Sequence, residues 1–160
     1  MSTVAVVDVV ARMFVALDDH DWESVIRCLA PTVRRDYSSL TGADPDDIDG
    51  PDLVAEWRAA IGGLDAHQHL LGLPVIDVPD DRVPDGDDTG EAARASVPVV
   101  GTHVLAGDPG SPWAVGGTYR MVLRQIEDRW RITAITLDTR WQTGDRAVLE
   151  RAAARAAGGV

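Results

Sequence analysis

Hydrophobic residues near the start of the chain recur at intervals of three and four. This spacing predicts a helix over residues 4–17, because positions that far apart share one face of an α-helix. The expected inward face carries Val7, Ala11 and Phe14, and Asp18 continues the same stripe. A carboxylate there needs a partner or a function, since an apolar environment removes its hydration. Asp18 also begins a polar run that fits an exposed turn, so the pattern leaves both orientations open.

The next part of the chain predicts a short helix, a strand and a loop. Asp21 is placed to cap a helix over residues 22–29, and Pro31 is expected to end it. Residues 33–40 fit a strand or an extended segment. The acidic residues 44–52, with their proline and glycine, predict a solvated loop.

After one more helix, apolar residues recur at every second position instead of at helical spacing. A third helix is predicted over residues 52–61, stopped by two glycines, and a strand over 66–78. Residues 79–90 predict a second acidic loop, and the Ala/Arg-rich residues 146–157 predict a terminal helix. Between these two segments the turn signals separate three long strands, at 92–106, 113–127 and 130–141.

Helices followed by a run of strands predict an α+β fold in which helices pack on an antiparallel sheet. A sheet that curls around its helices forms a cone, and the inside of such a cone is a good place for a small ligand. The 160 residues suit one domain, 1–160, with residues 142–160 as a peripheral tail.

Composition narrows the classes of function. The net charge of −11 argues against nucleic-acid binding, because the chain repels phosphate backbones. Cys28 is the single cysteine, which excludes an internal disulfide, and its place in an apolar pattern predicts a small buried side chain. We see no signal peptide and no apolar run long enough to cross a membrane, so a cytoplasmic location is expected.

Histidines on the predicted strands are the candidate chemical groups. His103 shares its strand face with Val97, Val99 and Leu105, so it points inward. It is either a satisfied core histidine or, if Asp18 turns inward as its partner, a general acid or base.

Two further histidines lie two residues apart on a predicted strand. His67 and His69 therefore face the same way and could begin a metal site, but no third ligand stands at a recognisable spacing, and no metal is predicted. Tyr119 shares its face with core residues, and the adjacent glycines 116 and 117 indicate a bend in that strand. The sequence has no phosphate-binding glycine loop, nucleophile elbow or paired-cysteine motif, which argues against nucleotide cofactors.

Several short segments resemble scytalone dehydratase and, more broadly, the SnoaL-like part of the nuclear transport factor 2 (NTF2)-like superfamily. The resemblance runs from the first helix to the last strand. It rests on these residues: Asp21-Trp22, Leu29-Ala30-Pro31-Thr32, Asp36-Tyr37, Gln68-His69, Trp130-Arg131 and Thr139-Arg140-Trp141.

The resemblance implies an NTF2-like cone, a homo-oligomer (trimer or dimer), and dehydration of a cyclic hydroxy ketone without metal or organic cofactor. By position it implies that Asp18, His69 and His103 are catalytic and that Tyr37 holds the carbonyl side. The family's substrate-orienting residues are replaced here, since its tyrosine before the aspartate is Leu17 and its strand serine and asparagine fall on Gly117 and Tyr119. These departures put the substrate in doubt more than the acid–base chemistry.

Three functions are therefore kept open. The first is a lyase that dehydrates a small polyketide-like or steroid-like hydroxy-carbonyl compound, with an apolar or aromatic substrate as the partner. The second is a SnoaL-like polyketide cyclase or isomerase, and the third is a non-catalytic ligand-binding or scaffold domain. For an enzyme, the side chains expected to contact substrate are Phe14, Leu17, Tyr37, Trp57 and Tyr119, although the tryptophans are also typical packing residues.

Overall fold

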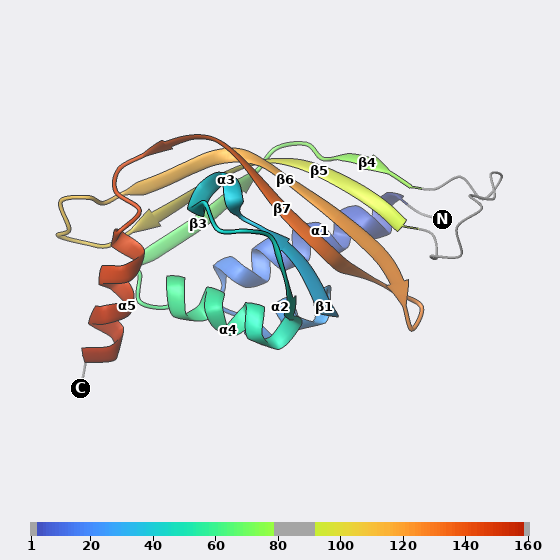
Figure 1. The fold of residues 1–160 in the computed structure, drawn as a ribbon, viewed down its shortest axis with the longest axis horizontal. Coiled ribbons are helices and arrows are strands. Elements are labelled where there is room, and N and C mark those ends of the chain that lie inside the picture. The colour runs from blue at the N-terminus through green and yellow to red at the C-terminus, as the bar shows by residue number, and fades with distance from the viewer. Residues whose placement is uncertain (1–2, 79–91, 159–160) are drawn as a thin grey trace.

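The computed structural model describes residues 3–78 and 92–158, so the predicted loop at 79–90 lies outside the described residues. A curved sheet arches over the helices α1 and α4 (Figure 1). The helices are α1 (Thr3–Asp18), α2 (Trp22–Cys28), α3 (Ser38–Thr41), α4 (Gly50–Ile61) and α5 (Val148–Gly158). The strands are β1 (Leu29–Asp36), β2 (Asp46–Asp49), β3 (Ala66–Leu71), β4 (Val75–Asp77), β5 (Ala92–Val104), β6 (Trp113–Ile126) and β7 (Arg129–Thr143).

The seven strands form one sheet in the order β2-β1-β7-β6-β5-β3, with β4 also pairing β5. All neighbours are antiparallel except β1 and β7, which run parallel. This arrangement confirms the predicted α+β cone, in which the helices fill the concave side of an open sheet. Among the described helices, none is long and apolar enough to cross a membrane.

The buried face of α1 is only partly the predicted one: Phe14 is buried as predicted, but Val7 is only partly buried. Val6, Val10 and Met13 are buried together with Leu17, whereas Ala11 is exposed. The helix carries apolar residues on nearly every side, so periodicity alone does not fix its rotation about its own axis. Packing against the sheet and α2 selects the face, and this leaves Asp18 partly buried at its edge.

The helix α2 begins as predicted, since the Asp21 carboxylate accepts the backbone N–H of Ser24 at 3.1 Å. The prediction that Pro31 ends this helix is wrong: the helix ends at Cys28, and Pro31 lies inside β1. Pro31 falls where the pairing of β1 with β7 is irregular and before its pairing with β2 begins, so its missing N–H costs the ladder little. The predicted strand at 33–40 is also shifted, because its second half forms α3.

The acidic segment predicted as a loop contains a strand. Asp46 to Asp49 form β2 and pair with β1, and α4 then begins at Gly50, two residues earlier than predicted. Pairing with β1 explains this, because Arg35 on that strand donates to the Asp46 carboxylate at 2.9 and 2.6 Å. Four residues rich in aspartate have little strand propensity of their own.

The single strand predicted over residues 66–78 is divided into β3 and β4, which both pair with β5. The break lies opposite Pro98, which has no N–H to give to a ladder. Gly72 donates its N–H to the Pro98 carbonyl at 2.8 Å, and a Cβ on Gly72 would lie 2.9 Å from the Pro98 ring.

The three long strands agree closely with prediction, and β6 contains the predicted irregularity. The pairing of β6 with β7 shifts between Gly116 and Gly117. A Cβ on Gly117 would lie 2.1 Å from the carbonyl oxygen of Asp138, so the two backbones approach too closely for any side chain there.

Residues 142–160, expected to be a peripheral tail, include the end of β7 and the helix α5. Val148 and Ala152 on α5 have no exposed surface. Arg151 ties this helix to the β5–β6 turn by donating to Asp108 at 2.6 and 2.9 Å. These contacts make α5 part of the packed structure.

Candidate active site

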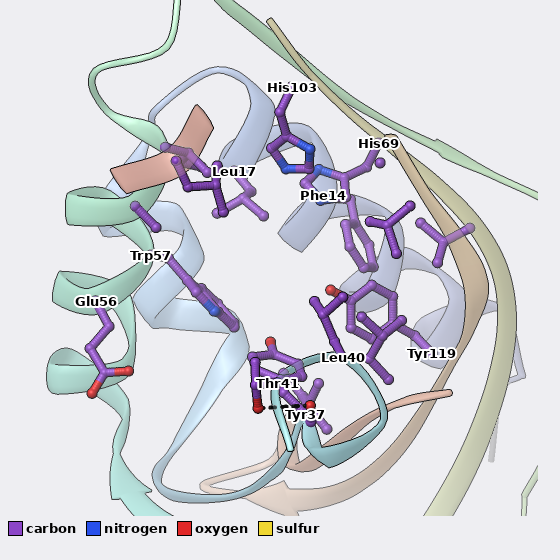
Figure 2. Close-up of a pocket in the computed structure, with 18 of the residues that line it drawn as sticks. Phe14, Leu17, Tyr37, Leu40, Thr41, Glu56, Trp57, His69, His103 and Tyr119 are labelled. Atoms are coloured by element: carbon purple, nitrogen blue, oxygen red, sulfur yellow. Dashed lines mark hydrogen bonds between the residues drawn. The ribbon is translucent and has the colours of Figure 1, made fainter. Parts of the chain in front are cut away.

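A cavity of about 270 Å³ lies inside the cone (Figure 2). Its walls come from α1, α3, α4 and the concave face of the sheet. The predicted substrate contacts all line it, together with two of the three predicted catalytic residues: Phe14, Leu17, Tyr37, Trp57, Tyr119, His69 and His103. The remaining lining is mostly apolar, so the cavity suits a small hydrophobic molecule.

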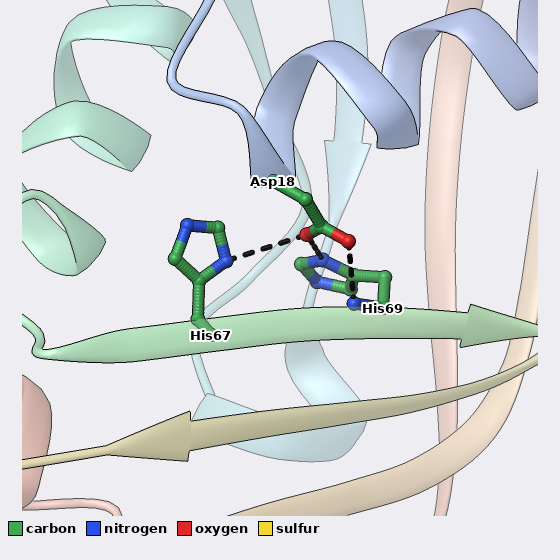
Figure 3. A group of neighbouring side chains, drawn as sticks. All are labelled: Asp18, His67 and His69. Atoms are coloured by element: carbon green, nitrogen blue, oxygen red, sulfur yellow. Dashed lines mark hydrogen bonds and ion pairs between the residues drawn. The ribbon is translucent and has the colours of Figure 1, made fainter.

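Asp18 lies behind this wall at the end of α1 and orients His69 on β3. The Nδ1 atom of His69 lies 2.8 Å from Asp18 Oδ1, and the backbone N–H of His69 donates to Oδ2 at 2.9 Å (Figure 3). Burial alone would raise the pKa of the Asp18 carboxyl, but the hydrogen bonds from His69 hold it below its usual value. Because a carboxylate only accepts hydrogen bonds, His69 carries its proton on Nδ1 and Nε2 is left as the basic atom.

The prediction that Asp18 pairs with His103 is wrong. The end of α1 lies over the outer strand β3, and β5 is one strand further in. His103 instead contacts Trp113, with ring centroids 4.5 Å apart, and stands edge-on to His69 at 6.1 Å. Burial, with His69 nearby, lowers the pKa of His103 to about 4, so its ring is neutral at pH 7.

His67 joins the same group of side chains; the sequence placed it on one strand face with His69 but did not reveal that Asp18 meets them both. Its Nδ1 lies 3.3 Å from Asp18 Oδ1, and its Nε2 lies 2.7 Å from Nε2 of His20. Burial lowers the pKa of His67 below its ordinary value. The sequence offered no third ligand to accompany His67 and His69, but the fold supplies Asp18, and the ligand atoms of the three residues lie within 4.8 Å of one another.

Two tyrosines lie across the cavity from the histidines. Burial raises the pKa of the Tyr119 phenol to about 12, and burial beside Tyr119 raises the pKa of Tyr37 well above its ordinary value. Both phenols therefore keep their protons at neutral pH and can donate hydrogen bonds. They approach the cavity from different elements, since Tyr37 precedes α3 and Tyr119 stands on β6 just beyond the bulge at Gly117.

Charged residues at the cavity were not predicted. Arg35 and Glu56 both line it and form an ion pair with each other. Arg35 lies in a run of three charged residues, and no sequence signal distinguishes either side chain from an ordinary surface charge. Only the packing of α4 against β1 shows that they border the cavity.

The arrangement can perform acid–base chemistry. It combines a carboxylate-oriented imidazole, a neutral second imidazole and two protonated phenols around an apolar space. A base of this kind can remove a proton from carbon, and the phenols can stabilise negative charge on an oxygen.

Solved structures with this fold come from several bacteria. The Kfla4162 protein of Kribbella flavida is 24% identical, covers 92% of this chain and 95% of its own, and superposes with a TM-score of 0.77. A Novosphingobium aromaticivorans protein provisionally named a scytalone dehydratase is 15% identical over 88% of this chain and 85% of its own (TM-score 0.69). The hexachlorocyclohexane dehydrochlorinase LinA-type3 of Novosphingobium barchaimii is 9% identical over 89% of this chain and 88% of its own (TM-score 0.66).

These identities show a shared fold. No match was found among the curated proteins. The model of the SnoaL-like domain family matches residues 2–136, which is most of the chain. The protein therefore belongs to the SnoaL-like domain family of the NTF2-like superfamily.

Proposed function

We propose that the protein is a cofactor-independent lyase that eliminates water from a small cyclic hydroxy-carbonyl compound. The observation that carries this proposal is a pair of hydrogen bonds between Asp18 and His69, which lies at the wall of an apolar cavity. One joins the carboxylate to His69 Nδ1 at 2.8 Å, and the other joins it to the His69 backbone N–H at 2.9 Å. These two hydrogen bonds fix the orientation of the ring and its tautomer.

In this mechanism His69 Nε2 takes the proton from the carbon next to the carbonyl. The C–H electron pair moves into an enolate, whose oxygen is stabilised by the phenols of Tyr37 and Tyr119. The C–O bond at the β carbon then breaks as the new C=C bond forms, and the proton on Nε2 passes to the departing hydroxyl, which leaves as water. His103, neutral at pH 7, holds that hydroxyl.

The size of the cavity supports a small substrate. An engineered cavity of about 150 Å³ binds benzene, so about 270 Å³ suits one or two fused rings better than a four-ring skeleton. Two structures with this fold are named for enzymes that eliminate a small molecule, a dehydratase and a dehydrochlorinase, which favours elimination over cyclisation.

The test is a panel of cyclic β-hydroxy ketones of one or two rings, followed by mass spectrometry for loss of water. The exchange of α-protons in D₂O is followed by NMR on the same compounds. Asp18→Asn and His69→Ala are expected to lower kcat/KM by about 10²–10⁴-fold. Asp19→Asn is the matched control, because Asp19 is the exposed neighbour and should retain wild-type turnover.

Three results would count against the proposal. The first is near-wild-type turnover in both Asp18→Asn and His69→Ala. The second is a product of unchanged mass, which would indicate the isomerase or cyclase function. The third is neither water loss nor proton exchange across the panel, which would favour a non-catalytic binding domain.

A further inference from the structure

Three side chains direct one ligand atom each towards a common point at the end of α1 (Figure 3). Asp18 Oδ1 lies 2.8 Å from His69 Nδ1 and 3.3 Å from His67 Nδ1. In a tetrahedral zinc site with bonds of about 2.0–2.1 Å, neighbouring ligand atoms lie roughly 3.3–3.4 Å apart. The three atoms all lie within 4.8 Å of one another, so side-chain rotations that bring the two imidazoles closer together would place all three at bonding distance of one cation.

His67 is the residue that the proposed mechanism does not use. Its side chain is only 3% exposed, and its Nδ1 is buried with no hydrogen-bond partner among the described residues. The 3.3 Å approach to Asp18 lacks the geometry of a hydrogen bond. A buried polar atom in this state is costly, and a cation between Nδ1 and the carboxylate would satisfy it.

The surroundings of His67 also suit a metal ligand. Its other ring nitrogen, Nε2, lies 2.7 Å from Nε2 of His20, and the two rings stack with centroids 4.9 Å apart. Metal-binding histidines usually donate their second N–H to such a partner, which fixes the ring and its tautomer. If Nε2 of His67 donates to His20, the lone pair of His67 lies on Nδ1, the atom that faces Asp18.

We propose that Asp18, His67 and His69 form a binding site for a transition-metal dication of the Zn²⁺ class. Two imidazoles and one carboxylate favour Zn²⁺, Co²⁺, Ni²⁺ or Cu²⁺ over Mg²⁺ and Ca²⁺, which prefer oxygen ligands. Three protein ligands leave a fourth position for water. Binding would replace the proton on His69 Nδ1 and so break its hydrogen bond to Asp18. Without that hydrogen bond His69 would no longer be oriented as the proposed base, and elimination activity would be lost. This loss of activity rests on the proposed function, whereas metal binding itself does not.

The experiment uses the full chain freed of metal by dialysis against a chelator. Zn²⁺ is titrated by calorimetry, and Co²⁺ by visible absorption, which is intense when the ion is tetrahedral. Wild type is expected to bind one equivalent of either ion. Loss of a supporting outer residue typically weakens a metal site about 10–100-fold, so His20→Ala should fall in that range and His67→Ala should exceed it.

Asp47→Asn is the control for adventitious binding by surface carboxylates, because Asp47 is exposed and far from the cluster in sequence; it should bind like wild type. His67→Phe is a second variant that fills the buried space if His67→Ala does not fold. Unchanged Zn²⁺ affinity in both His67 variants, or no saturable uptake by wild type, would overturn the proposal. Full activity of both Asp18→Asn and His69→Ala would overturn the dehydratase and leave the metal result standing.

Discussion

Replacing Arg35 with methionine tests how the wall of the cavity is held together. The Arg35 side chain is 19% exposed and links its own strand β1 to two other elements: its guanidinium donates to Asp46 on β2 at 2.9 and 2.6 Å and pairs with Glu56 on α4. Methionine retains most of the apolar stem and removes every donor. The change therefore isolates the ion pairs from the packing of the side chain.

The expected loss in the free energy of unfolding follows from how buried Arg35 and its two partners are. Hydrogen bonds to charged groups contribute about 1.5–3 kcal/mol each when protected from water. Asp46 is 48% and Glu56 58% exposed, so both carboxylates regain hydration once Arg35 is gone, and solvent screening reduces the loss. We expect about 1–3 kcal/mol of destabilisation, which for a chain of this length lowers the Tm by roughly 6 °C at the middle of the range.

Urea unfolding followed by tryptophan fluorescence measures this difference, and the neighbouring residue supplies the control. Arg34 pairs with Asp47 at 3.5 Å, and the two side chains are 52% and 64% exposed. Arg34→Met should therefore cost no more than about 1 kcal/mol. If both variants lose the same free energy of unfolding, the argument from burial is refuted.

Three other outcomes are expected. Hydrogen bonds from Arg151 hold the pKa of the Asp108 carboxyl below its ordinary value, so this contact stabilises α5 at neutral pH and is lost as the pH falls through the lowered value. The protection factors of the α5 amides, taken against their intrinsic exchange rates at each pH, should therefore fall on acidification, and Asp108→Asn should remove that pH dependence. Gly117→Ala should destabilise the fold by about 1–3 kcal/mol in thermal unfolding, because its Cβ would meet a β7 carbonyl at 2.1 Å, whereas Gly158→Ala, in open space, should not. Burial raises the pKa of the Cys28 thiol, so a thiol reagent should react with it only on unfolding, and fast labelling of the native protein would contradict its burial.

The sequence alone determined the kinds of elements and most of their order. Strict alternation along β5 correctly placed His103 inward, because the period-two pattern of a half-buried strand is local information. The acidic cap at Asp21 and the bend at Gly116 and Gly117 were likewise readable, since each depends on the preference of one or two residues. Helices followed by strands then sufficed for the α+β cone.

Tertiary structure decided which groups meet. The pairing of β3 with β5 sets His69 opposite Gly101, where a Cβ would lie only 3.4 Å from the His69 ring, so the missing side chain leaves room for that ring. The rotation of α1 then brings Asp18 to His69, and the partner expected from the sequence, His103, lies one strand away. Neither the register of two strands nor the rotation of an all-round apolar helix is encoded locally, because both result from how the whole core packs.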